Sequence, residues 1–350
     1  MFVARAPFCR GVRDWKMACV VVASRLACLL ALSCGNGTPP PPVGALPNSK
    51  PRVVLEHGPI ARIEAPHELD KGKVDLGRRL FADARLSANG QVACSSCHDL
   101  SKGGADSVPF SRGVTGAPLS LNTPTVFNSA LNFRQFWDGR AANLEEQVDG
   151  PLISKDEMGS SWPAVLSVLR ADAGYTRAFA RSYPRGIEEW SVKDALASFE
   201  ASLSTPDAPF DRFLAGEADA IDANAHKGYE LFTSYGCSAC HQGRGVGGNM
   251  FQKLGVMADY FADRGHDSAA DQGRFNVTHD EADRHVFKVP SLRNVALTAP
   301  YLHDGSLATL EDVIRVMARY QLGRDVDAND VGALAAFLRT LSGRYKGGVP

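Results

Sequence analysis

The sequence predicts a mainly α-helical chain made of two related halves. Three segments carry apolar residues at helical spacing, and no segment shows the sustained alternation of apolar and polar residues that is typical of β-strands. The pentapeptide Cys-x-x-Cys-His occurs twice, at residues 94–98 and 237–241, with similar segments around each copy. A set of motifs repeated in the same order indicates an internal duplication.

Each of the three predicted helices is placed by one apolar face. The first covers residues 68–83, the second begins at Ser191 as its N-cap, and the third covers residues 329–341. The residues expected to face the core are Leu69, Leu76, Leu80, Phe81, Val192, Leu196, Phe199, Leu203, Val331, Leu334, Phe337, Leu338 and Leu341. Core packing accounts for these faces, so they predict structure and no function.

The duplication is visible as a constant spacing between paired segments. Gly77–Phe81 precedes the first pentapeptide, and Gly228–Phe232 precedes the second. Downstream, three segment pairs match at an offset of 166 residues: 124–128 with 290–294, 137–139 with 303–305, and 142–146 with 308–312. The segment Thr205–Pro209 interrupts the preceding helix. We therefore expect two related domains, over residues 57–210 and 211–350.

The pentapeptides have the spacing that attaches a haem covalently. The two thiols of each motif add across the vinyl groups of the porphyrin, and the histidine that follows reaches the iron. A structural zinc site or a redox dithiol is the alternative, but neither a further cysteine pair nor a thioredoxin-like pattern surrounds the motifs. The residues predicted to hold two c-type haems are Cys94, Cys97 and His98, and Cys237, Cys240 and His241.

Residues 1–34 have the pattern of an export signal. A basic stretch precedes the apolar run Leu26–Leu32, which is far shorter than the ~20 apolar residues that a membrane span needs. Cys34 ends a segment that resembles a lipoprotein cleavage box, so it is a candidate for a lipid anchor. Met17 is an alternative start, and residues 35–56 form a proline-rich linker. We expect a periplasmic protein.

Charge limits the kinds of partner. Residues 1–34 hold five cations and one anion, so their removal changes the formal net charge from −1 to −5. The remaining body has no basic patch, which argues against nucleic-acid binding. Its mild negative charge suits a basic or neutral protein partner.

The two halves differ in the side chains that they offer to a haem. Trp137 of the first half aligns with His303 of the second, and only the second half offers a methionine, Met317, in the following helix. A thioether opposite histidine raises the reduction potential of a haem, so we interpret Met317 as the sixth ligand of the second haem rather than as core. The first half offers Gln147 and Glu157 instead. Glu157 is either a proton carrier for cleavage of an O–O bond or a solvated carboxylate.

Together these motifs resemble those of the bacterial di-haem cytochrome c peroxidases. The segments that carry the resemblance are Thr123–Asn128, Gln135–Arg140, Thr298–His303 and Gln321–Gly323, and the similarity runs from about residue 57 to about residue 343. The resemblance implies a mostly α fold of two cytochrome c-like domains with calcium between them. It also implies a homodimer that reduces hydrogen peroxide with electrons from a small cytochrome c or a cupredoxin.

The resemblance further implies a role for each candidate residue. The first haem would react with peroxide at low potential, and the second, with Met317, would accept electrons at high potential. Trp137 would relay electrons between them, and Gln147 and Glu157 would line the peroxide pocket. The residues that match the calcium ligands are Asn122 and, through their backbone carbonyls, Thr298 and Pro300, with water completing the shell.

One position departs from the pattern of the family. Many members carry a histidine in the loop after the first pentapeptide, where it blocks the peroxide-reacting iron until a reduction-driven rearrangement. The matching loop is Phe110–Gly116, with Val114 at that position, and no histidine occurs between His98 and His226. We expect a first haem that is open to peroxide in the oxidised protein, unless His266 or His279 reaches the iron.

Two other functions remain as alternatives. A related di-haem oxidase that modifies a protein or an organic substrate also lacks the blocking histidine, but those relatives use tyrosine where Met317 is predicted. A di-haem electron carrier without peroxidase activity would have six ligands on both irons, whereas the first half leaves its iron open.

Overall fold

The computed structural model describes residues 58–64 and 69–347, all of which belong to one compact unit, Ser49–Pro350. The predicted export signal, the proline-rich linker and Cys34 lie outside the described residues. Within the described ranges, no helix is both long and apolar enough to cross a membrane.

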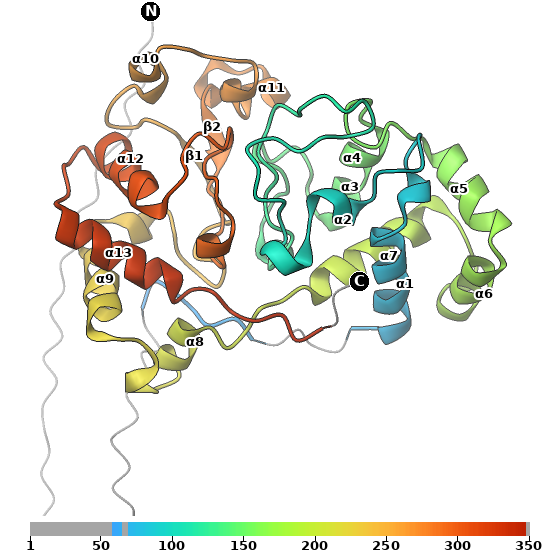
Figure 1. Ribbon diagram of the computed structural model, residues 1–350, viewed down its shortest axis with the longest axis horizontal. Coiled ribbons are helices and arrows are strands. Elements are labelled where there is room, and N and C mark those ends of the chain that lie inside the picture. The colour runs from blue at the N-terminus through green and yellow to red at the C-terminus, as the bar shows by residue number, and fades with distance from the viewer. Residues whose placement is uncertain (1–57, 65–68, 348–350) are drawn as a thin grey trace, which may run out of the picture. The chain divides into compact units, whose positions relative to one another are not determined.

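Helices dominate the described part of the chain, which confirms the expected mainly α-helical class (Figure 1). The helices of the first half are α1 Lys71–Phe81, α2 Cys94–Cys97, α3 Leu144–Gln147, α4 Asp149–Ile153, α5 Trp162–Ala171, α6 Ala173–Ser182 and α7 Glu189–Ser202. Those of the second half are α8 Pro209–Leu214, α9 Ala223–Ser234, α10 Tyr260–Arg264, α11 Phe275–Thr278, α12 Leu310–Leu322 and α13 Ala328–Arg339. The strands β1 Phe251–Lys253 and β2 Val286–Lys288 pair antiparallel, with Phe251 opposite Lys288.

The three helices expected from their apolar faces are present as α1, α7 and α13, but two details of the prediction are wrong. Ser191 is not the N-cap of α7, because the helix already begins after Glu188. The backbone N–H of Glu188 donates to Oγ of Ser191, so this serine closes the first turn from within the helix. Leu69 precedes the N-cap Asp70 and is 37% exposed, so it lies outside the core. The other residues predicted to face the core are buried.

Each half is built on one close pair of helices, α1 with α7 and α9 with α13 (Figure 1). A Cβ atom at Gly77 would lie 1.9 Å from the carbonyl oxygen of Ala195, and one at Gly228 would lie 2.0 Å from that of Ala333. Any side chain at either glycine would therefore push the helices apart. This contact explains why a glycine stands in the same place before each pentapeptide.

The turns that follow the pentapeptides also repeat. Asn128 and Asn294 both have a φ of 60°, and each begins a short 3₁₀ turn. Their Nδ2 groups donate to the same hydroxyl, Oγ1 of Thr205, at 2.8 and 3.0 Å. Farther along, Phe136 and Leu302 take φ values of 70° and 68°. These pairs share the offset of 166 residues seen in the sequence.

Two separate apolar cores accompany the two helix pairs. The first contains residues of α1, α5, α6 and α7, and the second contains residues of α8, α9, α12 and α13. Ile60 packs in the second core although it precedes α1, and its neighbour Ile63 donates its N–H to Asp211. Tyr345, near the other end, packs against the first core. Each core is therefore completed by a segment from the opposite end of the described chain.

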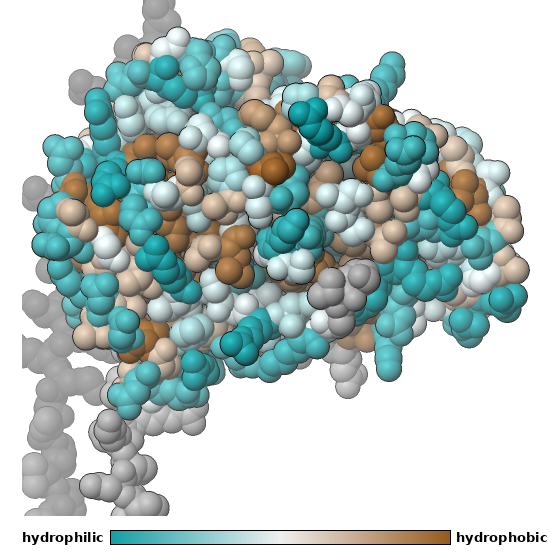
Figure 2. Space-filling model, viewed as in Figure 1, coloured by the Kyte–Doolittle hydropathy of each residue, from teal (hydrophilic) through white to brown (hydrophobic). Residues whose placement is uncertain are grey.

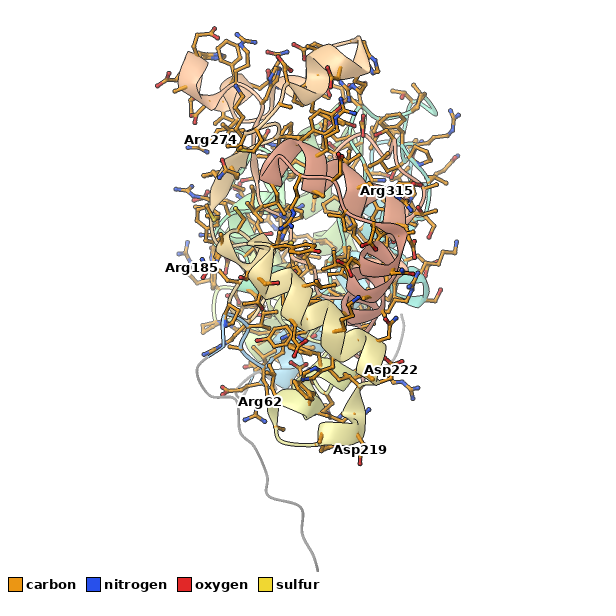
Figure 3. All side chains as sticks on the ribbon, turned by 90° about the vertical axis from the view of Figure 1, so that its left-hand side faces the viewer. Arg62, Arg185, Asp219, Asp222, Arg274 and Arg315 are labelled. Carbon is orange, nitrogen blue, oxygen red and sulfur yellow. The ribbon has the colours of Figure 1, made fainter. Side chains whose placement is uncertain are left out.

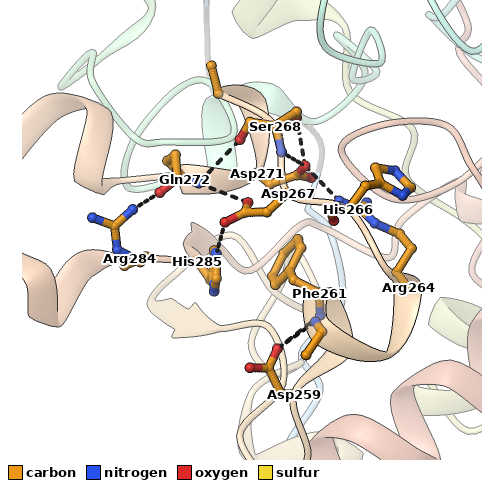
Figure 4. A network of polar contacts seen from close by, with 12 residues as sticks. Asp259, Phe261, Arg264, His266, Asp267, Ser268, Asp271, Gln272, Arg284 and His285 are labelled. Atoms are coloured by element: carbon orange, nitrogen blue, oxygen red, sulfur yellow. Dashed lines mark hydrogen bonds and ion pairs between the residues drawn. The ribbon is translucent and has the colours of Figure 1, made fainter.

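A polar network holds the loop around α10 (Figure 4). Asp271 accepts hydrogen bonds from the N–H and the Oγ of Ser268, both at 2.6 Å. Gln272 donates to Asp267 at 2.8 Å and also contacts Arg284. The network continues from Asp271 to the buried ring of His303, whose Nε2 lies 2.6 Å from the carboxylate.

The outer surface of the body is mixed in character. On the face shown in Figure 2, hydrophobic residues form separate small areas between hydrophilic ones. Asp219 and Asp222 lie near the start of α9, at the opposite end of the view in Figure 3 from Arg274. Both signs of charge are thus present on this side of the second half.

Candidate functional site

A cavity of about 480 Å³ lies in the first half, within the size range of cofactor and ligand pockets. Its walls come from the first pentapeptide, the loop 117–126, α3 and the segment after α4. The residues predicted for the first haem and its pocket all line it, namely Cys94, Cys97, His98, Trp137, Gln147 and Glu157. Asn122, expected at a calcium site, lines it as well.

His98 is oriented as a histidine ligand of a metal usually is. It follows the single turn of α2, and its Nδ1 lies 3.2 Å from the carbonyl oxygen of Gly104. With the proton on Nδ1, that nitrogen donates to Gly104 and Nε2 keeps its lone pair. Burial lowers the pKa of His98, which favours the neutral ring that binds iron.

The two thiols of the first motif face the same space. Burial raises the pKa of Cys94 to about 12, and it also raises the pKa of Cys97. Neither thiol forms a disulfide. Two free thiols and a neutral imidazole that line the same large cavity fit the covalent attachment of a c-type haem.

Glu157 is a partly buried carboxyl group at the cavity wall. Burial raises its pKa, and the charge of Arg140 and a hydrogen bond from Ser154 oppose this effect. The backbone N–H of Val114 donates to the carbonyl oxygen of Glu157 at 2.8 Å, so the loop 110–116 lies against this segment. A carboxyl group whose pKa is raised by burial can exchange a proton with a bound oxygen compound.

Among the described residues that line this cavity, His98 is the only histidine. Val114 is partly buried but is not part of the lining. His266 and His279 are exposed residues of the second half, and neither lines the cavity. The described structure therefore places no second imidazole opposite His98.

Trp137 lies where the two halves meet. Its Nε1 donates to the carbonyl oxygen of Asn122 at 2.9 Å, and its ring centroid is 6.5 Å from that of His303. The N–H of Asn122 in turn donates to the carbonyl oxygen of His303 at 2.8 Å. A second, smaller cavity of about 190 Å³ is lined by Trp137 and Phe287. Trp137 thus contacts the first cavity and the second half at once.

The second pentapeptide is placed differently from the first. Cys237, Cys240, His241 and Met317 line neither of these two cavities. Burial lowers the pKa of His241 to about 4, and its buried Nδ1 has no hydrogen-bond partner among the described residues. Met317 lies on α12 and packs, partly buried, against a cluster that contains Phe287 and Tyr320. A buried imidazole that stays neutral keeps a lone pair for a metal ion, which fits a haem ligand, although its Nδ1 lacks the hydrogen bond that His98 makes to Gly104.

Lys288 is a candidate residue that the sequence did not reveal. It lies in β2, is 7% exposed, and forms neither a hydrogen bond from its ammonium group nor an ion pair with a described residue. Burial lowers its pKa to about 8. The adjacent strand β1 approaches the second motif, since Nε2 of Gln252 lies 4.0 Å from Sγ of Cys240. An unpaired buried ammonium suits the carboxylates of a haem.

Glu200 is a second residue of this kind, in the first half. It lies on α7, lines the larger cavity and is 7% exposed. Burial, with a smaller contribution from Glu145, raises the pKa of its carboxyl group to about 8. Lysine and glutamate are usually exposed even within apolar segments, so the sequence pattern alone does not reveal that both residues are buried.

The proposed calcium ligands lie in neighbouring segments. The backbone N–H of Asn122 donates to the carbonyl oxygen of His303, which stands three residues after Pro300 in the other half. Nδ2 of Asn122 donates to the carbonyls of Val108 and Pro109. Oδ1 of Asn122 and the carbonyl oxygens of Thr298 and Pro300 accept no hydrogen bond from a described residue. These three oxygen donors suit a hard cation.

Asp271, His303 and Asp304 form the only group of three or more acidic or imidazole side chains with metal-binding spacing among the described residues. The guanidinium of Arg264 already lies 2.6 Å from Asp271 and 2.7 Å from Asp304. Although burial acts in the opposite direction, hydrogen bonds from Arg264, Ser268 and His303 hold the pKa of Asp271 well below its usual range. This group is therefore an ion-paired network rather than a metal site.

Comparison with known proteins agrees with this geometry. The family model "Di-haem cytochrome c peroxidase" matches residues 71–219. The chain is 44% identical to cytochrome c peroxidase Ccp of Escherichia coli (strain K12), over 82% of this chain and 62% of that protein. It is 42% identical to cytochrome c551 peroxidase of Nitrosomonas europaea, over 83% of this chain and 86% of that protein.

A solved structure gives the same relationship. The crystal structure of a MauG-like protein associated with microbial copper homeostasis matches with a TM-score of 0.72 and 31% identity, over 82% of this chain and 94% of that one. The chain spans less than two thirds of the Escherichia coli protein but most of the other two. The similarity to the Nitrosomonas europaea protein extends over most of both chains at 42% identity, which is more than a shared fold alone requires. The chain therefore belongs to the di-haem cytochrome c peroxidase family.

Proposed function

We propose that the protein is a cytochrome c peroxidase, which converts H₂O₂, two electrons and two protons into two molecules of water. The observation that carries the proposal is the cavity beside His98, which holds Gln147 and Glu157 and, among the described residues, no second histidine. The family membership supplies the reaction class. A haem bound by Cys94, Cys97 and His98 supplies the redox-active iron of that reaction.

In this proposal the cavity residues prepare the peroxide. Glu157, whose pKa is raised by burial, would take a proton from the bound peroxide and give it to the departing oxygen. The amide of Gln147 orients the substrate by hydrogen bonding, and Arg140 keeps positive charge near Glu157. Trp137, which contacts both halves, is the proposed path for electrons from the second half.

The second half is proposed to receive the electrons. Cys237, Cys240 and His241 would hold the second haem, with Met317 as sixth ligand, and Lys288 would pair with its carboxylates. Calcium at Asn122, Thr298 and Pro300 would fix the contact between the halves. The repeated glycine contacts and turns support an origin of the domains 57–210 and 211–350 by internal duplication.

Partners and location complete the proposal. The donor would be a small cytochrome c or a cupredoxin, the enzyme would work in the periplasm, and the molecule would be a homodimer. Cys34 would carry a lipid anchor. Mass spectrometry of the mature protein and light scattering in solution check the last two points.

The decisive test uses the oxidised protein with both haems attached. Electron-spin and absorption spectra should show a high-spin first haem that reacts with stoichiometric peroxide before any reduction. Turnover should then follow when a reduced cytochrome c or cupredoxin is added. A low-spin first haem that stays inert to peroxide until the second haem is reduced would contradict the open site, and a protein without turnover would be an electron carrier.

A di-haem oxidase that modifies an organic or protein substrate is the second candidate, favoured by the match to a MauG-like structure. The two functions differ in the sixth ligand of the second haem. The absorption band of methionine-bound ferric haem should be present in the oxidised protein and absent from Met317→His. Its absence from the unmodified protein would favour the oxidase.

A further inference from the structure

The carboxyl group of Glu200 is buried in the wall of the first cavity without a partner. The side chain is 7% exposed and lines the cavity together with Cys94, His98 and Glu157. No described residue forms a hydrogen bond or an ion pair with its carboxyl group. A buried carboxyl group without a partner is costly whether it is protonated or ionised, so a role beyond packing is indicated.

The second half shows that packing does not require this carboxyl. Ala195 and Phe199 of α7 contact Gly77 as Ala333 and Phe337 of α13 contact Gly228. Glu200 follows Phe199, and the residue that follows Phe337 is Leu338, which is buried to the same extent. A leucine thus fills the equivalent position in the same helix pair.

A second polar group accompanies Glu200 in the first half only. Oγ of Ser129 is buried, lines the same cavity and has no hydrogen-bond partner among the described residues. Its counterpart at the offset of 166 residues is Val295. The polarity of this wall is therefore particular to the half with the open cavity.

Burial and the groups that face Glu200 disfavour the ionised form of its carboxyl group. The elements packed against α7 are α1, α3 and the turn Ser129–Leu131. From α3 it faces the like charge of Glu145, and from α2 the thiol of Cys94. On α1, Arg78 lies over the ring of Phe199, and Lys73 pairs with Asp194; the turn contributes no charged group.

We propose that Glu200 is the proton acceptor coupled to reduction of the haem held by Cys94, Cys97 and His98. When a haem held there takes up one electron from a reduced cytochrome c or cupredoxin, one proton from the bulk solvent would form an O–H bond on the Glu200 carboxylate. The O–H bond of the water molecule that supplies this proton breaks, and the hydroxide stays in the bulk solvent. The net charge of the buried site then stays constant, which avoids the cost of an uncompensated charge in a low-dielectric wall. Reoxidation of the iron releases the proton again. The inference rests on the proposed function only in placing a haem in this cavity.

The test is the pH dependence of the midpoint potential of the first haem, measured optically during redox titration without peroxide. Coupling of one proton to one electron changes the reduction equilibrium tenfold for each pH unit, which is about 59 mV. The unmodified protein should approach this slope above about pH 8, where the Glu200 carboxyl of the oxidised protein is ionised, and Glu200→Gln should show a nearly flat profile. Glu200→Asp should restore the slope, because it retains a carboxyl group.

Two further variants locate the effect. Glu145→Gln removes the neighbouring exposed charge and should shift the pH range of the slope without abolishing it. Glu200→Leu reproduces the second half and should behave as Glu200→Gln. In redox-difference infrared spectra, the unmodified protein should gain a protonated carboxyl band on reduction, and Glu200→Gln should lack it.

The inference is overturned if Glu200→Gln keeps both the slope and the carboxyl band. It is also overturned if only Glu157→Gln removes them, because the acceptor would then be Glu157. Since no peroxide is present, a protein with no peroxidase turnover could still show the predicted slope. Turnover with an unchanged slope in Glu200→Gln would instead leave the proposed function intact and contradict the role of Glu200.

Discussion

The two halves share one frame and differ in what that frame encloses. Both pair two helices over a glycine, and both place an asparagine turn against Thr205. At matching positions, however, the first half has Gln147 and Glu200 where the second has Val313 and Leu338. A few substitutions on a common frame therefore give the cavity of the first half polar side chains at positions where the second half has apolar ones.

The largest expected effect tests the chemistry assigned to the first half. Glu157→Gln should lower kcat roughly a thousandfold, because the loss of a positioned proton carrier costs 10²–10⁴-fold. Steady-state assays with peroxide and a reduced cytochrome c measure it. Glu145→Gln, which removes an exposed carboxyl on α3, is the matched control and should retain most activity. An equal loss of kcat in both variants would show that Glu157 acts through its negative charge rather than as a positioned proton carrier.

The shared frame can be broken at its glycines. Gly77→Ala and Gly228→Ala should each destabilise the protein by about 3 kcal/mol, because the new methyl group would overlap a helix carbonyl. Urea unfolding provides the measurement. A Cβ at Gly332 of α13 meets nothing within 4 Å, so Gly332→Ala should instead stabilise by up to about 1 kcal/mol. Unequal losses in the free energy of unfolding at Gly77 and Gly228 would show that the two helix pairs depend on their close contacts to different extents.

Stability at different pH values sharpens the contrast between Glu200 and Leu338. Burial raises the pKa of Glu200 to about 8, above the ordinary value of a glutamate, so its carboxyl stabilises the fold least once it is ionised. The unmodified protein should lose roughly 2 kcal/mol of stability relative to Glu200→Leu between pH 5 and pH 7. Guanidinium unfolding at both pH values checks this. A gap that does not change with pH would contradict a raised pKa.

The smallest expected effect concerns the contact between the halves. Chelation of calcium should slow electron transfer between the haems, because Asn122 and the segment of Thr298 and Pro300 would lose their common ion. Both haems should stay attached, since thioether bonds hold them. Flash-induced electron transfer at the normal rate in a calcium-free sample would show that hydrogen bonds such as Asn122 to His303 suffice.

The sequence predicts well what depends on local periodicity and on repeated motifs. The apolar faces of α1, α7 and α13 follow from helical spacing, and the repeated glycines correspond to real helix contacts. The N-cap of α7 was misplaced, because a serine can close a helix turn from inside it as well as before it. Leu69 was misassigned because an apolar residue next to a helix need not face the core.

What the sequence does not predict depends on contacts between distant residues. Ile60 and Tyr345 pack against the core of the opposite half, and no local pattern encodes such an exchange. Glu200 and Lys288 are hidden for a related reason, since a polar residue in an apolar segment is usually exposed. Only the three-dimensional structure shows that both are buried.

The shared hydroxyl of Thr205 has a consequence for how far an electron must travel. The threonine stands in the covalent junction of the halves, is buried, and accepts one hydrogen bond from each of two turns that lead to the two haem-binding regions. A hydroxyl oxygen offers two lone pairs, so both bonds can persist together. Sliding of one turn past the other would break at least one of them. The hydroxyl oxygen of Thr205 thereby adds to the bonds between the halves, such as that from Asn122 to His303, that constrain the tunnelling distance between the two cofactor regions.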